Sequence, residues 1–290
     1  MTLSLSPIIA GAWRMADWGL SAQQRVRWIE ENIDLGISSF DHADIYGDYR
    51  VEALFGEALA LAPTLRARLQ LVGKCGIKLV SPARPEHAIK HYDTSAAHVQ
   101  ASVDASLKAL RSDHLDLLLI HRPDALLDAD ALSAAFEDLR RAGKVLHFGV
   151  SNFTPAQLSL LHRRCPLVTN QIELSPLHLN PLHDGTLDQC QELGLRPMIW
   201  SPLAGGRVFT GSDAVAQRVR DAFGVMAAEL GVSVTTLAYA WVLRHPSRPW
   251  PIVGSRRIEV ARDAVAALAL RLDAQQWYRI WSAGAGHEVP

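Results

Sequence analysis

Leu115-Asp116-Leu117-Leu118-Leu119-Ile120-His121 is a nearly continuous apolar run that ends in a histidine. A strand that is apolar on both faces is typical of a parallel sheet covered by helices on both sides. Seven other short apolar runs are separated from it and from one another by longer amphipathic stretches. The predicted strands cover residues 8–13, 38–40, 69–74, 115–121, 147–151, 168–171, 197–200 and 251–254. The pattern predicts a parallel sheet of eight strands.

Helices are predicted between these strands. Ser21 and Gln24 form a capping box for a helix over residues 22–35, and Thr154 caps a helix that has proline at its first position. Gly143 and Gly194 each end a helix just before a strand. Eight strands that alternate with helices favour an α/β fold of the (β/α)8 TIM barrel type over an open sheet. We expect one domain that spans residues 1–290.

Composition excludes several classes of protein. Hydrophobic residues make up 49% of the chain and charged residues 20%, which suits a folded domain with a large core. The formal net charge of -1 gives no reason to expect a nucleic-acid or membrane-surface partner. Three cysteines without CxxC spacing suit a reducing, cytoplasmic setting, and we expect neither a signal peptide nor a bound metal. The expected state is a monomer or a weak homo-oligomer.

Four polar side chains lie where predicted strands end: Asp41, Tyr46, Lys74 and His121. In barrels of this type the strand ends and the loops that follow them build the functional site. Each residue alone has an ordinary interpretation, since a lysine after a strand is usually a solvated charge and a histidine there usually a structural one. Their convergence on one rim makes the catalytic interpretation the stronger one.

The four side chains can act together as a proton donor. A free phenol has a pKa of about 10, and a neighbouring ammonium lowers that value, so Lys74 would tune Tyr46 while Asp41 fixes Lys74. Tyr46 would then protonate a carbonyl oxygen as a hydride reaches the carbonyl carbon, and His121 would orient the carbonyl. Because no side chain supplies a hydride, a nicotinamide cofactor is required.

These residues belong to a set of motifs that resembles the aldo-keto reductase family over essentially the full chain. The matching pieces are Gly11-Ala12-Trp13, residues 40–47 (FDHADIYG), Lys74, residues 117–123 (LLLIHRP), residues 149–153 (GVSNF), Asn170-Gln171, residues 200–203 (WSPL) and Gly254-Ser255. The chain is most similar to a bacterial oxidoreductase branch with an Asp-His-Ala-Asp-Ile-Tyr motif. The resemblance implies a TIM barrel that reduces aldehydes or ketones with NADPH (NADP+ when oxidised).

The resemblance also implies a set of binding residues. Ser151, Asn152 and Gln171 would hold the nicotinamide carboxamide, Trp200 would stack on the ring, and Arg256 would meet the adenosine 2′-phosphate. The full cofactor set is Ala12, Trp13, Asp41, Ser151, Asn152, Gln171, Trp200, Ser201, Leu203, Gly205, Arg207, Gly254, Ser255, Arg256 and Asp263. The expected substrate contacts are Trp13, Arg14, Tyr46 and His121. Met15 and Trp18 follow in the same loop, and Trp18 can equally be a packing residue.

Two positions depart from the family pattern. Relatives often carry arginine or glutamine where this chain has Val260, and asparagine where it has Ala264. Both residue types hold the adenine end of the cofactor, so the preference for NADPH over NADH stays open. Two other functions also stay open: an NADPH-binding regulatory subunit with slow turnover, and a cofactor-free barrel lyase or isomerase that uses Tyr46 and Lys74.

Overall fold

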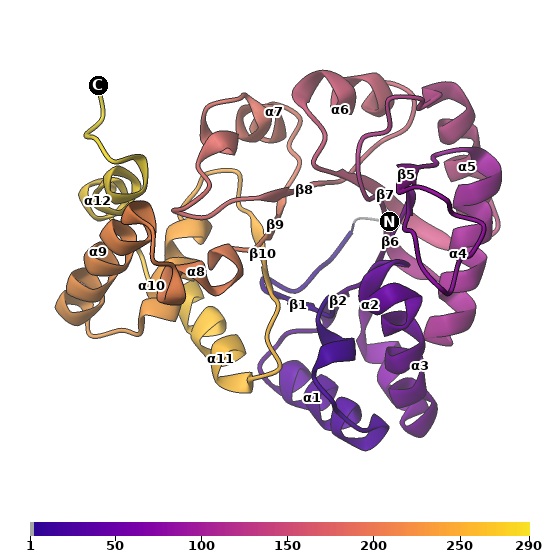
Figure 1. Cartoon of the computed structure of the whole chain (residues 1–290), viewed down its shortest axis with the longest axis horizontal. Coiled ribbons are helices and arrows are strands. Elements are labelled where there is room, and N and C mark those ends of the chain that lie inside the picture. The colour runs from indigo at the N-terminus through magenta and orange to yellow at the C-terminus, as the bar shows by residue number, and fades with distance from the viewer. Residues whose placement is uncertain (1–2) are drawn as a thin grey trace. The chain divides into compact units, whose positions relative to one another are not determined.

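A computed structural model describes residues 3–290, and its eight main strands form a closed parallel barrel in the order β1-β10-β9-β8-β7-β6-β3-β2 (Figure 1). The predicted (β/α)8 fold is confirmed. Each predicted strand is present, with ends that differ by at most two residues. The strands are β1 (Ile9–Gly11), β2 (Ser39–Asp41), β3 (Gln70–Cys75), β6 (Leu115–Ile120), β7 (Val145–Ser151), β8 (Asn170–Glu173), β9 (Met198–Trp200) and β10 (Trp250–Val253).

Helices separate the strands along the chain. The longer ones are α1 (Ala22–Asp34), α3 (Val51–Leu61), α4 (Ala96–Leu110), α5 (Ala129–Arg141), α6 (Pro155–His162), α7 (Thr186–Glu192), α9 (Ala214–Leu230), α10 (Val234–Leu243), α11 (Ile258–Ala266) and α12 (Ala274–Ala285). The short ones are α2 (Tyr46–Tyr49), α8 (Arg207–Thr210) and the 3-10 turns η1 (Met15–Asp17), η2 (Pro63–Arg68), η3 (Asn180–Leu182), η4 (Ala204–Gly206) and η5 (Ala267–Ala269). Both predicted helix starts are confirmed as capping boxes, at Ser21 and at Thr154.

The chain forms two compact units. The first takes in the chain up to Asn170 together with Gly254–Arg256, and the second comprises Gln171–Val253 and Arg257–Pro290. In the first unit β1, β2, β3, β6 and β7 pair in parallel, with Asp41 opposite Val72 and Lys74 opposite Leu119. This register brings the carboxyl ends of β2, β3 and β6 to the same edge of the sheet.

The core of the first unit explains why these strands sit where they do. All residues of β6 except Asp116 are buried, as its apolar run predicts. Asp116 tolerates its position because its carboxylate accepts the backbone N–H of Leu71 at 2.8 Å and a second N–H from Arg66 at 3.5 Å. Helices α3 and α4 approach so closely that a Cβ on Gly56 would lie 1.9 Å from the carbonyl oxygen of Ala109. The sheet and its helices are therefore tightly interlocked around the strand ends.

Two local features were not predicted. A small antiparallel hairpin of β4 (Ile77–Lys78) and β5 (His91–Tyr92) follows directly on β3. Its strands are only two residues long, too short for an alternation of apolar and polar residues to be visible. The second feature is the short helix α8, which is followed by Asp213 as the cap of α9.

The second unit is built around paired helices. The indoles of Trp241 in α10 and Trp277 in α12 stack with their centroids 5.0 Å apart, and each Nε1–H donates to the other residue's carbonyl oxygen. Cys75, Cys165 and Cys190, one in the second unit and two in the first, are buried free thiols. Among the helices of residues 3–290, none alone is long and apolar enough to cross a bilayer; α9 and α10 meet the requirement only together, bent by 97°.

Candidate active site

Three of the four strand-end side chains form one buried hydrogen-bonded chain in the first unit. The ammonium of Lys74, on β3, donates to the Oδ2 atom of Asp41 at 2.7 Å, to the hydroxyl oxygen of Tyr46 at 3.0 Å and to the backbone carbonyl of His42 at 2.8 Å. Lysine has three N–H donors, so all of them are used. The side chain of Lys74 is 0% exposed and that of Asp41 5%. The predicted pairing of these groups is therefore present in the structure.

Burial and charge act in opposite directions on this chain. Burial raises the pKa of Tyr46 and outweighs the positive charge of Lys74, which lowers it, so the pKa ends above the ordinary value. Asp41 adds to the increase because its carboxylate offsets the ammonium. Burial lowers the pKa of Lys74, but Asp41 and Tyr46 more than compensate, and the net shift is upward. At neutral pH the site thus holds a neutral phenol beside a charged ammonium. The sequence predicted a lowered pKa for Tyr46, whereas the pKa is raised. The prediction considered the charge of Lys74 but not the burial of the phenol.

His121 completes the group from the next strand. It directly follows β6, and its ring lies 5.8 Å from the ring of Tyr46 at an interplanar angle of 77°. Burial, together with the charges of Lys74, Arg122 and Lys90, lowers the pKa of His121 well below its usual value. The imidazole is therefore neutral at physiological pH. Its Nδ1 atom is buried without a hydrogen-bond partner among residues 3–290.

Ser151 and Asn152 lie at the end of β7 in the same unit. The amide of Asn152 donates to the hydroxyl of Ser151 at 2.7 Å, and Asn152 has a left-handed backbone with φ of 58°. The neighbouring Asn170 holds the loop through two hydrogen bonds to the backbone of Phe153, at 2.8 and 3.3 Å. Sequence reasoning gave Asn170 no structural role, although its place beside Gln171 at a strand end marked it. These contacts fix the backbone that carries the two predicted amide-binding residues.

The other predicted residues of the first unit differ in exposure. Ala12 is fully buried, and its N–H donates to the carbonyl oxygen of Asp41 at 3.0 Å. Trp13 is 57% exposed and lies under the guanidinium of Arg14 at 5.1 Å, so both side chains can reach a ligand. Arg256 donates to the carbonyl oxygen of Trp18 at 3.0 Å. Gly254 is exposed and Ser255 half-buried.

The loop after β1 also contains two residues that pack inward. Met15 is 2% exposed and belongs to the core, so its expected place in the substrate pocket is not supported by its burial. Trp18 packs edge-on against Trp28 with ring centroids 5.1 Å apart. Of the two interpretations left open for Trp18, this contact favours packing.

The remaining predicted residues lie in the second unit: Gln171, Trp200, Ser201, Leu203, Gly205, Arg207 and Asp263. Gln171 is 3% exposed. Ser201, Ala204, Gly205 and Gly206 have a left-handed backbone with φ between 50° and 101°. The N–H groups of Ala204 and Gly206 donate to the carbonyl oxygens of Ser201 and Leu203 at 2.7 and 2.9 Å. Arg207 pairs with Asp213 at 2.7 Å, and Asp263 accepts the hydroxyl of Ser233 at 2.9 Å.

The two departures from the family pattern have a packing explanation. Val260 is 9% exposed and Ala264 0%, and both lie on the buried side of α11. They are core residues of the second unit, where a longer polar side chain would have to be accommodated among apolar neighbours.

A cluster of buried acids lies next to the tetrad, the name used here for Asp41, Tyr46, Lys74 and His121. The sequence did not predict this cluster. Burial raises the pKa of Asp44 to about 7 and that of Glu52 to about 8. Asp44 accepts the hydroxyl of Ser102 at 2.9 Å, but its Oδ1 atom and the Oε1 atom of Glu52 are buried without a partner among residues 3–290. Both ring nitrogens of His42 are likewise buried without a hydrogen-bond partner among residues 3–290. The signal was present, since Glu52 stands in an otherwise apolar stretch of α3.

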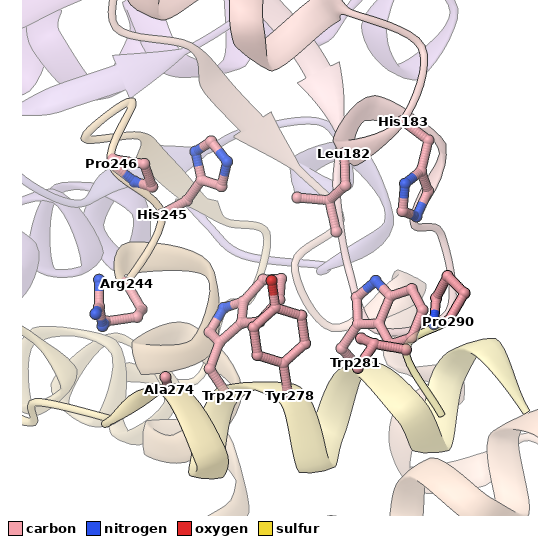
Figure 2. Close-up of a pocket in the computed structure, with 11 residues that line it drawn as sticks. Leu182, His183, Arg244, His245, Pro246, Ala274, Trp277, Tyr278, Trp281 and Pro290 are labelled. Carbon is pink, nitrogen blue, oxygen red and sulfur yellow. The ribbon is translucent and has the colours of Figure 1, made fainter. Parts of the chain in front are cut away.

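A hollow of about 460 Å³ lies within the second unit, lined by eleven residues (Figure 2). Trp277, Tyr278 and Trp281 of α12 form its floor, with Leu182 and His183 along one side. None of the predicted catalytic or cofactor residues lines it. Within residues 3–290 no group of three or more His, Cys, Asp or Glu side chains could hold a metal ion.

Comparison with known proteins shows the family of this chain. The profile of the Aldo/keto reductase family matches residues 7–285. This chain belongs to the aldo/keto reductase family. It is 54% identical to the oxidoreductase YdhF of Escherichia coli over 98% of this chain and 95% of that protein. It is 42% identical to a 6-dehydroglucose reductase of Agrobacterium fabrum over 99% of this chain and 97% of that protein.

Solved structures give the same assignment. An aldo/keto reductase from Klebsiella pneumoniae, in complex with NADP and acetate, superposes with a TM-score of 0.76 at 28% identity, over 95% of this chain and 90% of that one. Family membership makes this aldo/keto reductase an NAD(P)H-dependent oxidoreductase that acts on small carbonyl compounds.

Proposed function

We propose that this protein reduces aldehydes or ketones to alcohols with NADPH, using Tyr46 as the general acid. The observation that carries the proposal is the position of the Lys74 ammonium, 2.7 Å from Asp41 and 3.0 Å from the phenol of Tyr46. A protonated phenol can donate to a carbonyl oxygen, and the phenolate that remains lies beside a fixed positive charge. The ammonium therefore stabilises the product of proton transfer more than the starting state.

His121 is proposed to orient the carbonyl. Because its imidazole is neutral, it can donate one N–H without adding a second positive charge that would compete with Lys74. The ring of His121 stands edge-on to that of Tyr46, so a carbonyl oxygen held by both groups would receive two hydrogen bonds. These two donors would hold the carbonyl oxygen in place and stabilise the negative charge that develops on it.

The residues present fit a nicotinamide cofactor, which supplies the hydride when bound. Ser151 and Asn152 offer a hydroxyl and an amide, the partners that a carboxamide needs. The turn that follows β9 is left-handed at Ser201 and from Ala204 to Gly206, and turns of this kind can direct a backbone N–H, here that of Gly205, at a phosphate. Gly206 has no atom within 4 Å of a hypothetical Cβ, so a ligand could approach this backbone. We propose that Arg256 binds the adenosine 2′-phosphate of NADPH, because a guanidinium can form two parallel hydrogen bonds to a phosphate.

Replacing Tyr46 by phenylalanine tests the acid role. Tyr46→Phe should retain NADPH binding, measured by fluorescence titration, and lose about 10²- to 10⁴-fold in kcat for an aldehyde panel that includes a 6-aldehydo sugar. Retained turnover in Tyr46→Phe would refute the role. Wild-type protein that binds NADPH but shows no substrate-dependent oxidation in stopped flow would favour the regulatory subunit, and failure to bind either nicotinamide would favour a lyase or isomerase.

A further inference from the structure

Tyr46 is followed by a turn with an unusual backbone. Gly47, Asp48 and Tyr49 have φ of 56°, 59° and 64°, three left-handed residues in succession. Glycine adopts this conformation freely, but the backbone of other residues is strained in it. Space also restricts the turn, since a Cβ on Gly47 would lie 2.6 Å from the Cβ of Ala16. Contacts elsewhere must therefore hold Asp48 and Tyr49 in place.

The side chain of Tyr49 provides such contacts. Its hydroxyl oxygen accepts the backbone N–H of Leu79 at 2.9 Å, and the guanidinium of Arg84 lies 4.6 Å from its ring centroid. The hydrogen bond and the cation–π contact both stabilise the side chain of Tyr49 in this position and so oppose the strain of its backbone. Tyr49 thereby anchors the turn to the hairpin of β4 and β5.

The hairpin follows closely on β3. Gly76 separates the two, and in the hairpin Ile77 pairs with Tyr92 while Lys78 pairs with His91. The carbonyl oxygen of Leu79 accepts Nδ1–H of His87 at 2.9 Å, so both backbone groups of Leu79 are engaged. Because β3 carries Lys74, the hairpin connects the strand that holds the ammonium to the turn that holds the phenol.

We propose that Tyr49 is a positioning residue for Tyr46, and that the β4–β5 hairpin acts through Tyr49 to hold the phenol against the ammonium of Lys74. The proposal rests on the acid role of Tyr46 proposed above. Local backbone hydrogen bonds also shape the turn, from the N–H of Tyr49 to the carbonyl of Ile45 at 3.4 Å and from the N–H of Arg50 to the carbonyl of Tyr46 at 3.1 Å. The N–H of Tyr46 donates to the carbonyl of Ala43 at 3.1 Å, and Arg50 Nε donates to the carbonyl of Gly47 at 2.8 Å. None of them engages the ring or the hydroxyl of Tyr49.

Tyr49→Phe removes the hydroxyl and keeps the ring, and Tyr92→Phe is the matched control on the same hairpin. With five tyrosines in the chain, 13Cζ labelling resolves the phenol of Tyr46 without a substrate. In Tyr49→Phe the Tyr46 signal should shift and broaden at pH 7, and kcat should fall about three- to tenfold, the equivalent of one hydrogen bond. KM for NADPH and the number of cofactor sites should not change. Tyr92→Phe should match the wild type in all four readouts.

Two results would overturn the proposal: an unchanged Tyr46 signal in Tyr49→Phe, or a loss of kcat that only follows a loss of cofactor sites. If Tyr49→Phe does not fold, Arg84→Met tests the same link, and a fall in kcat of less than about twofold with an unchanged Tyr46 signal contradicts it. Failure of the proposed reaction is separate, because it would appear as an inactive wild type in which the Tyr46 signal still responds to Tyr49→Phe.

Discussion

Two groups of buried polar side chains lie side by side in the first unit, and they manage charge in different ways. In the tetrad, the ammonium of Lys74 donates all of its hydrogens at 2.7 to 3.0 Å and faces the carboxylate of Asp41. In the neighbouring acid cluster, Asp44 and Glu52 each bury an oxygen atom with no partner among residues 3–290. The first group is stable as an ion pair, whereas the second avoids charge by retaining protons.

The sharpest way to test this difference is to remove the cation of the tetrad. Lys74→Met leaves the buried carboxylate of Asp41 without its ammonium, so we expect a loss of about 3–5 kcal/mol in the free energy of unfolding, measured in urea at pH 7. The double variant Asp41→Asn with Lys74→Met removes both charges and should recover part of that loss. A single variant that costs less than about 1 kcal/mol would show that Asp41 is already solvated or protonated.

The acid cluster should respond to pH rather than to loss of a partner. A carboxyl whose pKa is raised on folding binds its proton more tightly in the folded state, so the stability it confers is complete at low pH and lost as pH rises. For Glu52, whose pKa is raised to about 8, the loss runs from its ordinary pKa near 4.5 up to about 8. Asp44, raised to about 7, contributes over the lower part of this range.

Glu52→Gln tests that expectation. The amide cannot ionise, so the free energy of unfolding of the variant should fall less steeply with pH than that of the wild type. Between pH 5 and 8 the two slopes should differ by on the order of 1 kcal/mol per pH unit, measured by urea unfolding at each pH. Glu31→Gln on α1 is the control, because the side chain of Glu31 is exposed. Parallel pH profiles for wild type and Glu52→Gln would mean that water or a rearranged donor already satisfies the glutamate.

The same contrast explains what the sequence could predict. Residue type and position at strand ends predicted that Asp41, Tyr46, Lys74 and His121 would lie close together, because parallel strands deliver their carboxyl ends to one edge. The buried cluster was not predicted because burial of Glu52 and His42 depends on the packing of α3 and α4 against the sheet, at distances along the chain that no local pattern records. Tyr49 was missed for the same reason, since its partner Leu79 is thirty residues away.

His42 provides the smallest and most specific test. Its ring is fully buried, packs edge-on against Phe55 at 4.5 Å, and has a pKa lowered to about 3 by burial and by the charge of Lys74. A neutral ring without hydrogen-bond partners contributes packing but no polar stabilisation. At pH 8, His42→Leu should therefore change the free energy of unfolding by only about 1 kcal/mol, with either sign. At pH 5 the unfolded wild type binds a proton at His42 that the folded wild type does not bind, so the variant should be more stable relative to wild type by a further ~2 kcal/mol. A large loss at pH 8 would show that the imidazole holds a hydrogen bond through water, and the cluster would then resemble the tetrad.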